Sequence, residues 1–141
     1  NHIAIRNARK VICPTHELAN LASSWGAEKK NTVLIPNSVD TSKFKSLSKT
    51  NYLYDVICVN RLVEWKGMKE VISACSRLNL RLAIAGTGPL HDELISFSQS
   101  IGAQVEFLGD VLNEDLVKYF NSSRIYVLNS TYEATAYSLL E

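Results

Sequence analysis

The sequence predicts an α/β protein built on a doubly wound parallel sheet. From residue 52 onward the chain repeats one pattern four times: a short apolar run, a polar turn and an amphipathic segment. The apolar runs are strand length and rich in aliphatic and β-branched residues, which is typical of strands buried on both faces. With 141 residues, the chain is long enough for one ordinary domain and too short for two full ones.

The expected strands of this repeat are residues 53–59, 80–85, 105–108 and 125–128. The segments between them carry apolar stripes at helical spacing. The stripes are Met68, Val71, Ile72, Cys75 and Leu78, then Leu90, Leu94, Phe97 and Ile101, then Leu116, Val117 and Phe120. Right-handed crossovers place every strand-to-helix turn at the same edge of such a sheet.

The first fifty residues form a separate region. We expect a strand over residues 8–13, a helix striped by Leu18, Leu21, Ala22 and Trp25, and a strand over residues 32–35. Gly26 is expected to end the helix. Residues 40–51 are polar and read as a connector, so the sequence predicts a boundary between 1–49 and 50–141.

Composition excludes several classes of function. Fifteen basic and 14 acidic residues give a net charge of +1, so we expect no nucleic-acid partner. The apolar runs are too short to span a bilayer, and no signal-peptide pattern opens the sequence. Cys13, Cys58 and Cys75 form no C-x-x-C pair, which favours reduced core thiols in the cytosol.

The turn after the first strand of the repeat carries two cations. Residues 60–67 form neither G-x-G-x-x-G nor a P-loop, but contain Arg61 at the strand end and Lys66 at a helix start. Ligands of open parallel sheets bind beyond the carboxyl ends of the strands. Arg61 and Lys66 could therefore grip a diphosphate, and the alternative is a pair of solvated surface cations.

The next two turns are open. Gly86 and Gly88 either let a backbone approach a ligand closely or make a tight turn. Residues 109–111 give another open backbone turn.

The last turn holds two carboxylates. Glu133 and Glu141 lie eight positions apart and suit the recognition of hydroxyl groups, since a carboxylate only accepts hydrogen bonds. A helix starting near residues 137–139 would present free N–H groups to a phosphate. The sequence has no D-x-D and no metal-ligand spacing of its histidines, so we expect no metal.

Taken in order, these stretches resemble glycosyltransferase family 4, whose members have two Rossmann-like domains in the GT-B arrangement. The resemblance rests on Ile35-Pro36-Asn37-Ser38-Val39-Asp40 with Phe44, on residues 59–67, on residues 86–89 and on residues 133–141. The last stretch is similar to the E-x7-E signature of that family. The resemblance makes residues 1–49 the tail of an acceptor domain with its linker, and residues 50–141 an incomplete donor-binding domain.

The resemblance implies transfer of a sugar, with retention and without a metal or other cofactor, from a UDP-, GDP- or ADP-sugar to a glycan or lipid-linked acceptor. It implies catalytic roles for Arg61, Lys66 and Glu133. The implied donor-binding residues are Arg61 and Lys66 on the diphosphate, Glu133 on the sugar, Glu141 on the ribose, Ser138 and Leu139 on the phosphates, Gly109 and Val111 at the base, and the turn glycines Gly86 and Gly88. It also implies a cytoplasmic protein with peripheral association at the inner face of a membrane, and we expect residues 1–141 alone to transfer no sugar.

One departure leaves an alternative open. Ala134-Thr135-Ala136 stands where the family usually shows Gly-Phe-Gly, which puts donor preference in question. The alternative is a non-catalytic sugar-nucleotide-binding or interaction module of the same fold. An unrelated doubly wound domain, such as half of a dehydrogenase, is disfavoured because the glycine fingerprint is missing.

Overall fold

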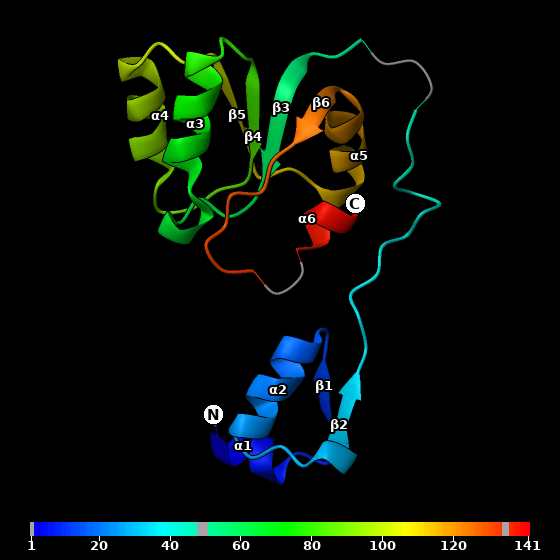
Figure 1. Cartoon of the computed structure of the whole chain (residues 1–141). Coiled ribbons are helices and arrows are strands. Elements are labelled where there is room, and N and C mark those ends of the chain that lie inside the picture. Colours follow the sequence, from blue (N-terminus) through cyan, green and yellow to red (C-terminus); the bar gives the residue numbers. More distant parts are fainter. Residues whose placement is uncertain (1, 48–50, 134–135) are drawn as a thin grey trace. The chain divides into compact units, whose positions relative to one another are not determined.

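A computed structural model describes residues 2–47, 51–133 and 136–141. The chain divides into two compact units (Figure 1). The first unit comprises Asn1–Val39 and Glu133–Leu140, and the second comprises Asp40–Tyr132 and Glu141. The predicted boundary between residues 49 and 50 falls outside the described residues and stays a prediction.

The first unit contains two parallel strands joined through a helix. Its elements are α1 (His2–Asn7), β1 (Val11–Cys13), α2 (His16–Ser24), a 3₁₀ turn (Lys29–Asn31), β2 (Thr32–Leu34) and the single-turn α6 (Tyr137–Leu140). Thr15 caps α2 by accepting a hydrogen bond from the Leu18 amide at 3.2 Å. Gly26 follows with φ +98°, so the predicted helix end is confirmed.

The second unit is built on a four-stranded parallel sheet in the order β5-β4-β3-β6. Its strands are β3 (Tyr54–Val59), β4 (Leu82–Ala85), β5 (Val105–Gly109) and β6 (Ser123–Tyr126), and its helices are α3 (Met68–Arg77), α4 (His91–Ser100) and α5 (Asn113–Asn121). The predicted α/β class and parallel sheet are confirmed.

Strand β6 begins earlier than the predicted 125–128. Ser123 already pairs with Tyr54, and its buried hydroxyl donates to the Tyr119 carbonyl at 2.8 Å. A satisfied polar residue therefore opens the strand, which an apolar run does not reveal. At the other end, the Val127 amide still donates to the Ile57 carbonyl at 3.0 Å, beyond the last ladder residue.

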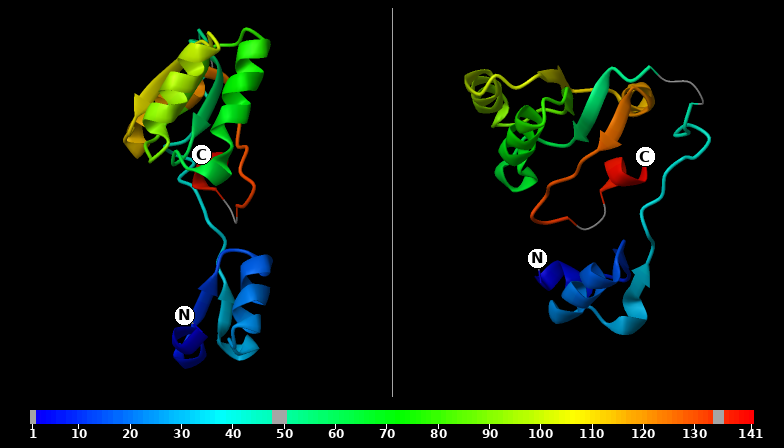
Figure 2. Two further views of the ribbon diagram at one scale, coloured as in Figure 1. Left: turned by 90° about the vertical axis from the view of Figure 1, so that its left-hand side faces the viewer. Right: turned by 45° about the horizontal axis from the view of Figure 1, so that its top comes forward.

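Helices cover both faces of this sheet. Residues paired across parallel strands point to the same face, so Ile57 shares a face with Tyr126. The ring of Phe120 from α5 lies 5.8 Å from the ring of Tyr126, which places α5 on that face. Val56 points to the opposite face, where α3 and α4 lie side by side (Figure 2). The sheet is therefore doubly wound, as predicted.

The predicted core stripe of α3 is correct except at one end. Met68, Val71, Ile72 and Cys75 are buried, whereas Leu78 is 68% exposed. Leu78 is the C-cap residue, so the chain has left helical geometry there and its side chain no longer follows the stripe. Ile101, the C-cap of α4 in the second stripe, is exposed for the same reason.

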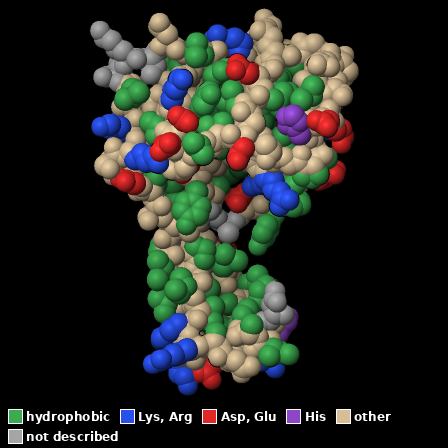
Figure 3. All heavy atoms as spheres, turned by 180° about the vertical axis from the view of Figure 1, so that it is seen from behind, with side chains coloured by type: hydrophobic (Ala, Val, Ile, Leu, Met, Phe, Trp, Pro, Cys, Tyr) green, Lys and Arg blue, Asp and Glu red, His purple; other side chains and the backbone are tan. Residues whose placement is uncertain are grey.

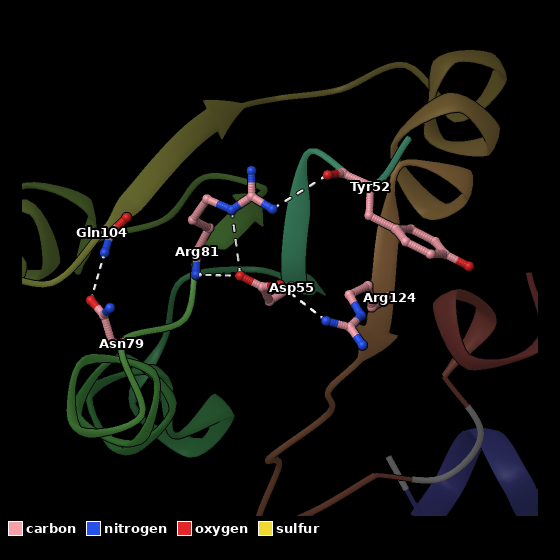
Figure 4. Close-up of polar contacts among 6 residues, drawn as sticks. All are labelled: Tyr52, Asp55, Asn79, Arg81, Gln104 and Arg124. Carbon is pink, nitrogen blue, oxygen red and sulfur yellow. Dashed lines mark hydrogen bonds and ion pairs between the residues drawn. The ribbon is translucent and has the colours of Figure 1, made fainter. Parts of the chain in front are cut away.

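A polar cluster ties together the amino ends of three strands (Figure 4). Asp55 of β3 accepts hydrogen bonds from the Arg81 amide at 3.0 Å and the Arg81 guanidinium at 3.4 Å, and pairs with Arg124 of β6 at 3.8 Å. The Arg81 amide, more than the two charges, holds the pKa of Asp55 below its ordinary value. This cluster occupies the edge opposite the strand-to-helix turns.

Candidate functional site

The order of the strands marks where a ligand is expected. The chain runs from β3 to β4 to β5 and then returns to β6 on the other side of β3, so the sheet has its switch point between β3 and β6. In open α/β sheets ligands bind outside the carboxyl ends of the strands at such a point. The predicted phosphate-binding loop, residues 60–67, starts there.

A cavity of about 400 Å³ lies at the carboxyl ends of β3, β4 and β5. It is lined by Val59, Asn60, Arg61, Ala85, Gly86, Thr87, Gly88, Asp110, Val111 and Leu116. Four of the predicted donor-binding residues, namely Arg61, Gly86, Gly88 and Val111, are therefore brought together. Lys66 and Gly109 belong to the same loops and are not among its lining residues.

The two glycines after β4 let the backbones of two loops touch. Gly86 has φ +128°, and a Cβ there would collide with the Asn60 carbonyl. A Cβ on Gly88 would collide with the backbone of Leu62, whose amide donates to the Thr87 carbonyl at 2.9 Å. The structure thus supports a close approach of two backbones, and contact of either glycine with a donor stays a prediction.

Gly109, at the third turn, differs from Gly86 and Gly88 because a side chain there would have room. It has φ +68°, and a Cβ on it would meet nothing within 4 Å. Its carbonyl accepts a hydrogen bond from the Gly86 amide at 2.7 Å, and this bond joins the turns after β4 and β5. The outward side of this turn is open backbone, as expected from the sequence.

The loop after β6 is hydrogen-bonded to the loop after β3. The Asn129 side chain donates to the Gly67 carbonyl at 3.0 Å, and the Thr131 amide donates to the Trp65 carbonyl at 2.9 Å. Lys66 lies between these two points, at the end of a 3₁₀ turn (Glu64–Lys66), and its side chain is half-buried. Asn129 could not be predicted as a contact residue from the sequence, because its hydrogen bond joins loops that are far apart in the chain.

Asn60 is a second polar residue that the sequence analysis missed. Its Nδ2 donates to the Met68 sulfur at 3.4 Å, while its Oδ1 is buried with no hydrogen-bond partner among the described residues. A buried acceptor without a donor is costly, so such an atom marks a place for a ligand or water donor. Its only signal in the sequence is its position, directly after the first strand of the repeat.

The carboxylates that the sequence singled out fall in different parts of the chain. Glu141 belongs to the second unit and lines a cavity of about 250 Å³ together with residues 44–46 and α5. Glu133, Ser138 and Leu139 lie in Glu133–Leu140, which groups with the first unit, so their donor-binding roles stay predictions. Of the departure from the family pattern, Ala134 and Thr135 lie outside the described residues.

Other chemistries find little support in the described residues. No three His, Cys, Asp or Glu side chains gather there as metal ligands. All three cysteines are free and buried, and burial raises the pKa of Cys58 to about 12, so this thiol stays protonated.

Charges of both signs are interspersed over the face of the second unit seen in Figure 3. None of the described helices combines the length and the apolar character needed to cross a bilayer.

Sequence comparison gives a family match over most of the chain. The sequence model described as "Glycosyl transferases group 1" matches residues 39–141. The chain is also 30% identical, over 142 aligned residues, to one of the subunits of phosphatidylinositol N-acetylglucosaminyltransferase from Arabidopsis thaliana. That alignment covers 94% of this chain and 32% of the relative, so the chain spans about a third of its length.

Solved structures with the same fold include two proteins with bound nucleotides. TarM of S. aureus, in complex with fondaparinux, alpha-GlcNAc-glycerol and UDP, superposes with a TM-score of 0.76 and 19% identity over 95% of this chain and 28% of TarM. Anabaena HepE in complex with UDP-glucose superposes with a TM-score of 0.76 and 21% identity over 92% of this chain and 40% of HepE. These likenesses show the fold.

Proposed function

Because the chain belongs to the group 1 glycosyl transferases, we propose that its cavity binds a nucleotide-sugar donor, and that the protein transfers the sugar to a glycan or lipid-linked acceptor with retention of configuration. The observation that carries the proposal is the cavity at the carboxyl ends of β3, β4 and β5. It unites Arg61 with the glycine turns that the sequence singled out independently.

The donor is proposed to be a UDP-sugar. TarM binds UDP in its solved structure and HepE binds UDP-glucose. In this chain, Arg61 would take the diphosphate bidentately and Lys66 would add a point charge from the same loop. The backbone at Gly109 and Val111 would meet the base, since that turn is open on its outward side.

The remaining roles follow the order of the motifs. Glu141 would accept hydrogen bonds from the ribose hydroxyls, and Glu133 would accept them from the sugar. The amides near Ser138 and Leu139 would meet the phosphates. These assignments rest on motif position.

The two cations would act mainly on the leaving group. As the bond from the sugar to the diphosphate breaks, negative charge grows on the phosphate oxygens. Fixed positive groups that face this charge stabilise the transition state more than the bound donor, and so they speed the reaction. We therefore propose that these cations neutralise the diphosphate and that no metal ion takes part.

The acceptor is proposed to be lipid-linked. The name of the Arabidopsis relative specifies transfer to phosphatidylinositol, and the alignment with it covers nearly all of this chain. A lipid-linked acceptor would lie at the surface of a membrane, and we propose that the full-length protein works there, on the cytoplasmic side.

Calorimetric titration of the full-length protein with UDP, GDP, ADP and NADH tests the proposal. We expect UDP to bind and NADH not to bind, and we expect Arg61→Ala to weaken UDP by at least tenfold, a loss of about 1.4 kcal/mol. Arg124→Ala is the matched control, because Arg124 lies at the opposite edge of the sheet. Binding of NADH in place of UDP would refute the proposal.

The departure at residues 134–136 motivates one further assay, because it leaves a non-catalytic module as the second candidate. UDP release from a panel of UDP-sugars, measured with lipid and glycan acceptors, separates the two functions. A protein that binds UDP but releases no UDP from any of the UDP-sugars would be the non-catalytic module.

A further inference from the structure

The segment that leads into the second unit is fastened along α5. We call residues 40–47 the strap. Its Phe44 ring lies 6.3 Å from the ring of Phe120. The side chain of Asn121, at the end of α5, accepts a hydrogen bond from the Leu47 amide at 2.7 Å and donates one to the Lys45 carbonyl at 3.2 Å. The described strap therefore belongs to the second unit.

At the other end of α5, Asn113 joins the strap to Glu141. Lys43 Nζ donates to Asn113 Oδ1 at 3.1 Å, and Asn113 Nδ2 donates to Glu141 Oε1 at 2.6 Å. An ammonium only donates and a carboxylate only accepts, so these two partners fix which way the amide faces. Asparagine fits this bridge because it offers an acceptor to one side and a donor to the other.

The start of α5 does not require this amide. Asn113 is the first helical residue, and the N-cap residue Leu112 makes no side-chain cap. The two hydrogen bonds of the Asn113 side chain are directed to Lys43 and Glu141. The bridge therefore needs an explanation other than helix capping.

We propose that Asn113 is a positioning residue for nucleotide binding, which holds one oxygen of Glu141 so that the other faces the ribose hydroxyls. This role rests on the proposed function, in which Glu141 receives the ribose. A free glutamate side chain would lose rotational freedom on binding the nucleotide, and the Asn113 hydrogen bond removes part of that loss beforehand. Lys43 keeps the amide turned the right way, so the strap supports the ribose site.

The test compares UDP with 2′,3′-dideoxy-UDP, which lacks the hydroxyls that Glu141 would bind. Both nucleotides are titrated calorimetrically into the full-length protein and its variants at one salt concentration. We expect Asn113→Ala to weaken UDP about threefold to tenfold, the effect of freeing one side chain, and to leave the dideoxy nucleotide unchanged. The preference for UDP over the dideoxy analogue should shrink by the same factor.

Two further variants separate positioning from a merely structural tie. Asn113→Asp keeps an acceptor for Lys43 but replaces the donor to Glu141 with a second carboxylate, so it should weaken UDP at least as much as Asn113→Ala. Asn121→Ala removes the hydrogen bonds that hold the strap at the other end of α5. The Asn121 side chain makes no hydrogen bond to Glu141 in the described structure, so this substitution should leave the preference for UDP intact. Circular dichroism and thermal midpoints establish that each variant is folded.

The outcomes are distinct. Wild-type affinity in Asn113→Asp, an equal loss for both nucleotides in Asn113→Ala, or a matching effect in Asn121→Ala would overturn the positioning role and leave the proposed function standing. A wild-type protein that does not bind UDP would overturn the proposed function, and this role with it.

Discussion

Replacing Gly86 by alanine tests the geometry of the cavity most directly. Gly86 has φ +128°, and its added Cβ would collide with the carbonyl of Asn60. The substitution therefore strains the backbone at one residue and pushes apart the loops after β3 and β4. Since Arg61 follows Asn60 directly, the change should also displace the residue proposed to bind the diphosphate.

The expected cost has two parts. An unfavourable backbone conformation for a residue with a side chain costs about 1–3 kcal/mol. Overpacking against a neighbour that cannot easily withdraw costs about 1–3 kcal/mol more. Gly86→Ala should thus remove roughly 2–6 kcal/mol from a total stability on the order of 5–15 kcal/mol.

Two other glycines separate these parts. Gly102 has φ +64° with nothing within 4 Å of its added Cβ, so Gly102→Ala should show backbone strain alone, about 1–2 kcal/mol. Gly88 has no positive φ, and its Cβ would collide with the Leu62 backbone. Gly88→Ala should therefore show the packing cost alone, about 1–3 kcal/mol.

Urea denaturation followed by the fluorescence of Trp65 measures all three. Trp65 belongs to the second unit, so the part of the fluorescence change that is lost in a Trp65→Phe background reports on that unit. Calorimetric titration with UDP is then run on each folded variant. If Gly86→Ala destabilises the protein no more than Gly102→Ala, the loops are not in contact and the description of the cavity is wrong.

Three further predictions concern catalysis, metals and pH. Arg61→Ala and Lys66→Ala should each lower kcat/KM by about two to three decades and affect UDP affinity less, and wild-type kcat/KM in both would make them ordinary surface cations. Excess EDTA should leave the Kd for UDP within about twofold of its value in Mg²⁺, whereas a change of about a hundredfold would establish a metal requirement. Asp55→Asn should lower the thermal midpoint at pH 7. Because the folded state holds the pKa of Asp55 down, its stabilisation is present above the ordinary pKa of 3.8 and lost as the pH falls through the lower folded value. The difference in thermal midpoint between wild type and Asp55→Asn should therefore shrink as the pH falls below the ordinary pKa, and a difference that persists in acidic melts would refute this role of Asp55.

Much of the fold could be predicted because its signal is local. The central strands β3 and β4 are apolar runs whose residues are mostly buried, and the core residues of α3 recur at helical spacing. The differences occur at element ends. Ser123 opens β6 through a hydroxyl bond to α5, and Leu78 lies past the last turn of α3, and neither fact is visible in apolar periodicity.

The turns that line the cavity could be predicted from the sequence, whereas the contacts of the side-chain amides could not. Arg61, Gly86, Gly88 and Val111 could be chosen because each lies in a turn that follows a strand, and parallel strands bring such turns to one edge. Asn113 and Asn129 gained their importance from partners distant in the chain, Glu141 and Gly67. Side-chain amides are common at turns and helix starts, so only the folded chain distinguishes these two.

The position of β6 also decides how the chain can reach its native state. Strand β3 pairs with β4 soon after both are made, but its other side stays open until Ser123–Tyr126 arrives. Pairing between segments so distant in sequence is slow, and an open apolar strand edge can meanwhile pair with another molecule. Asp55 and Arg124, whose side chains lie 3.8 Å apart across these two strands, give the correct neighbour an attraction that a second copy of β3 would lack. Two copies of β3 paired in parallel and in register would instead place Asp55 next to Asp55, and the repulsion between these like charges disfavours that pairing.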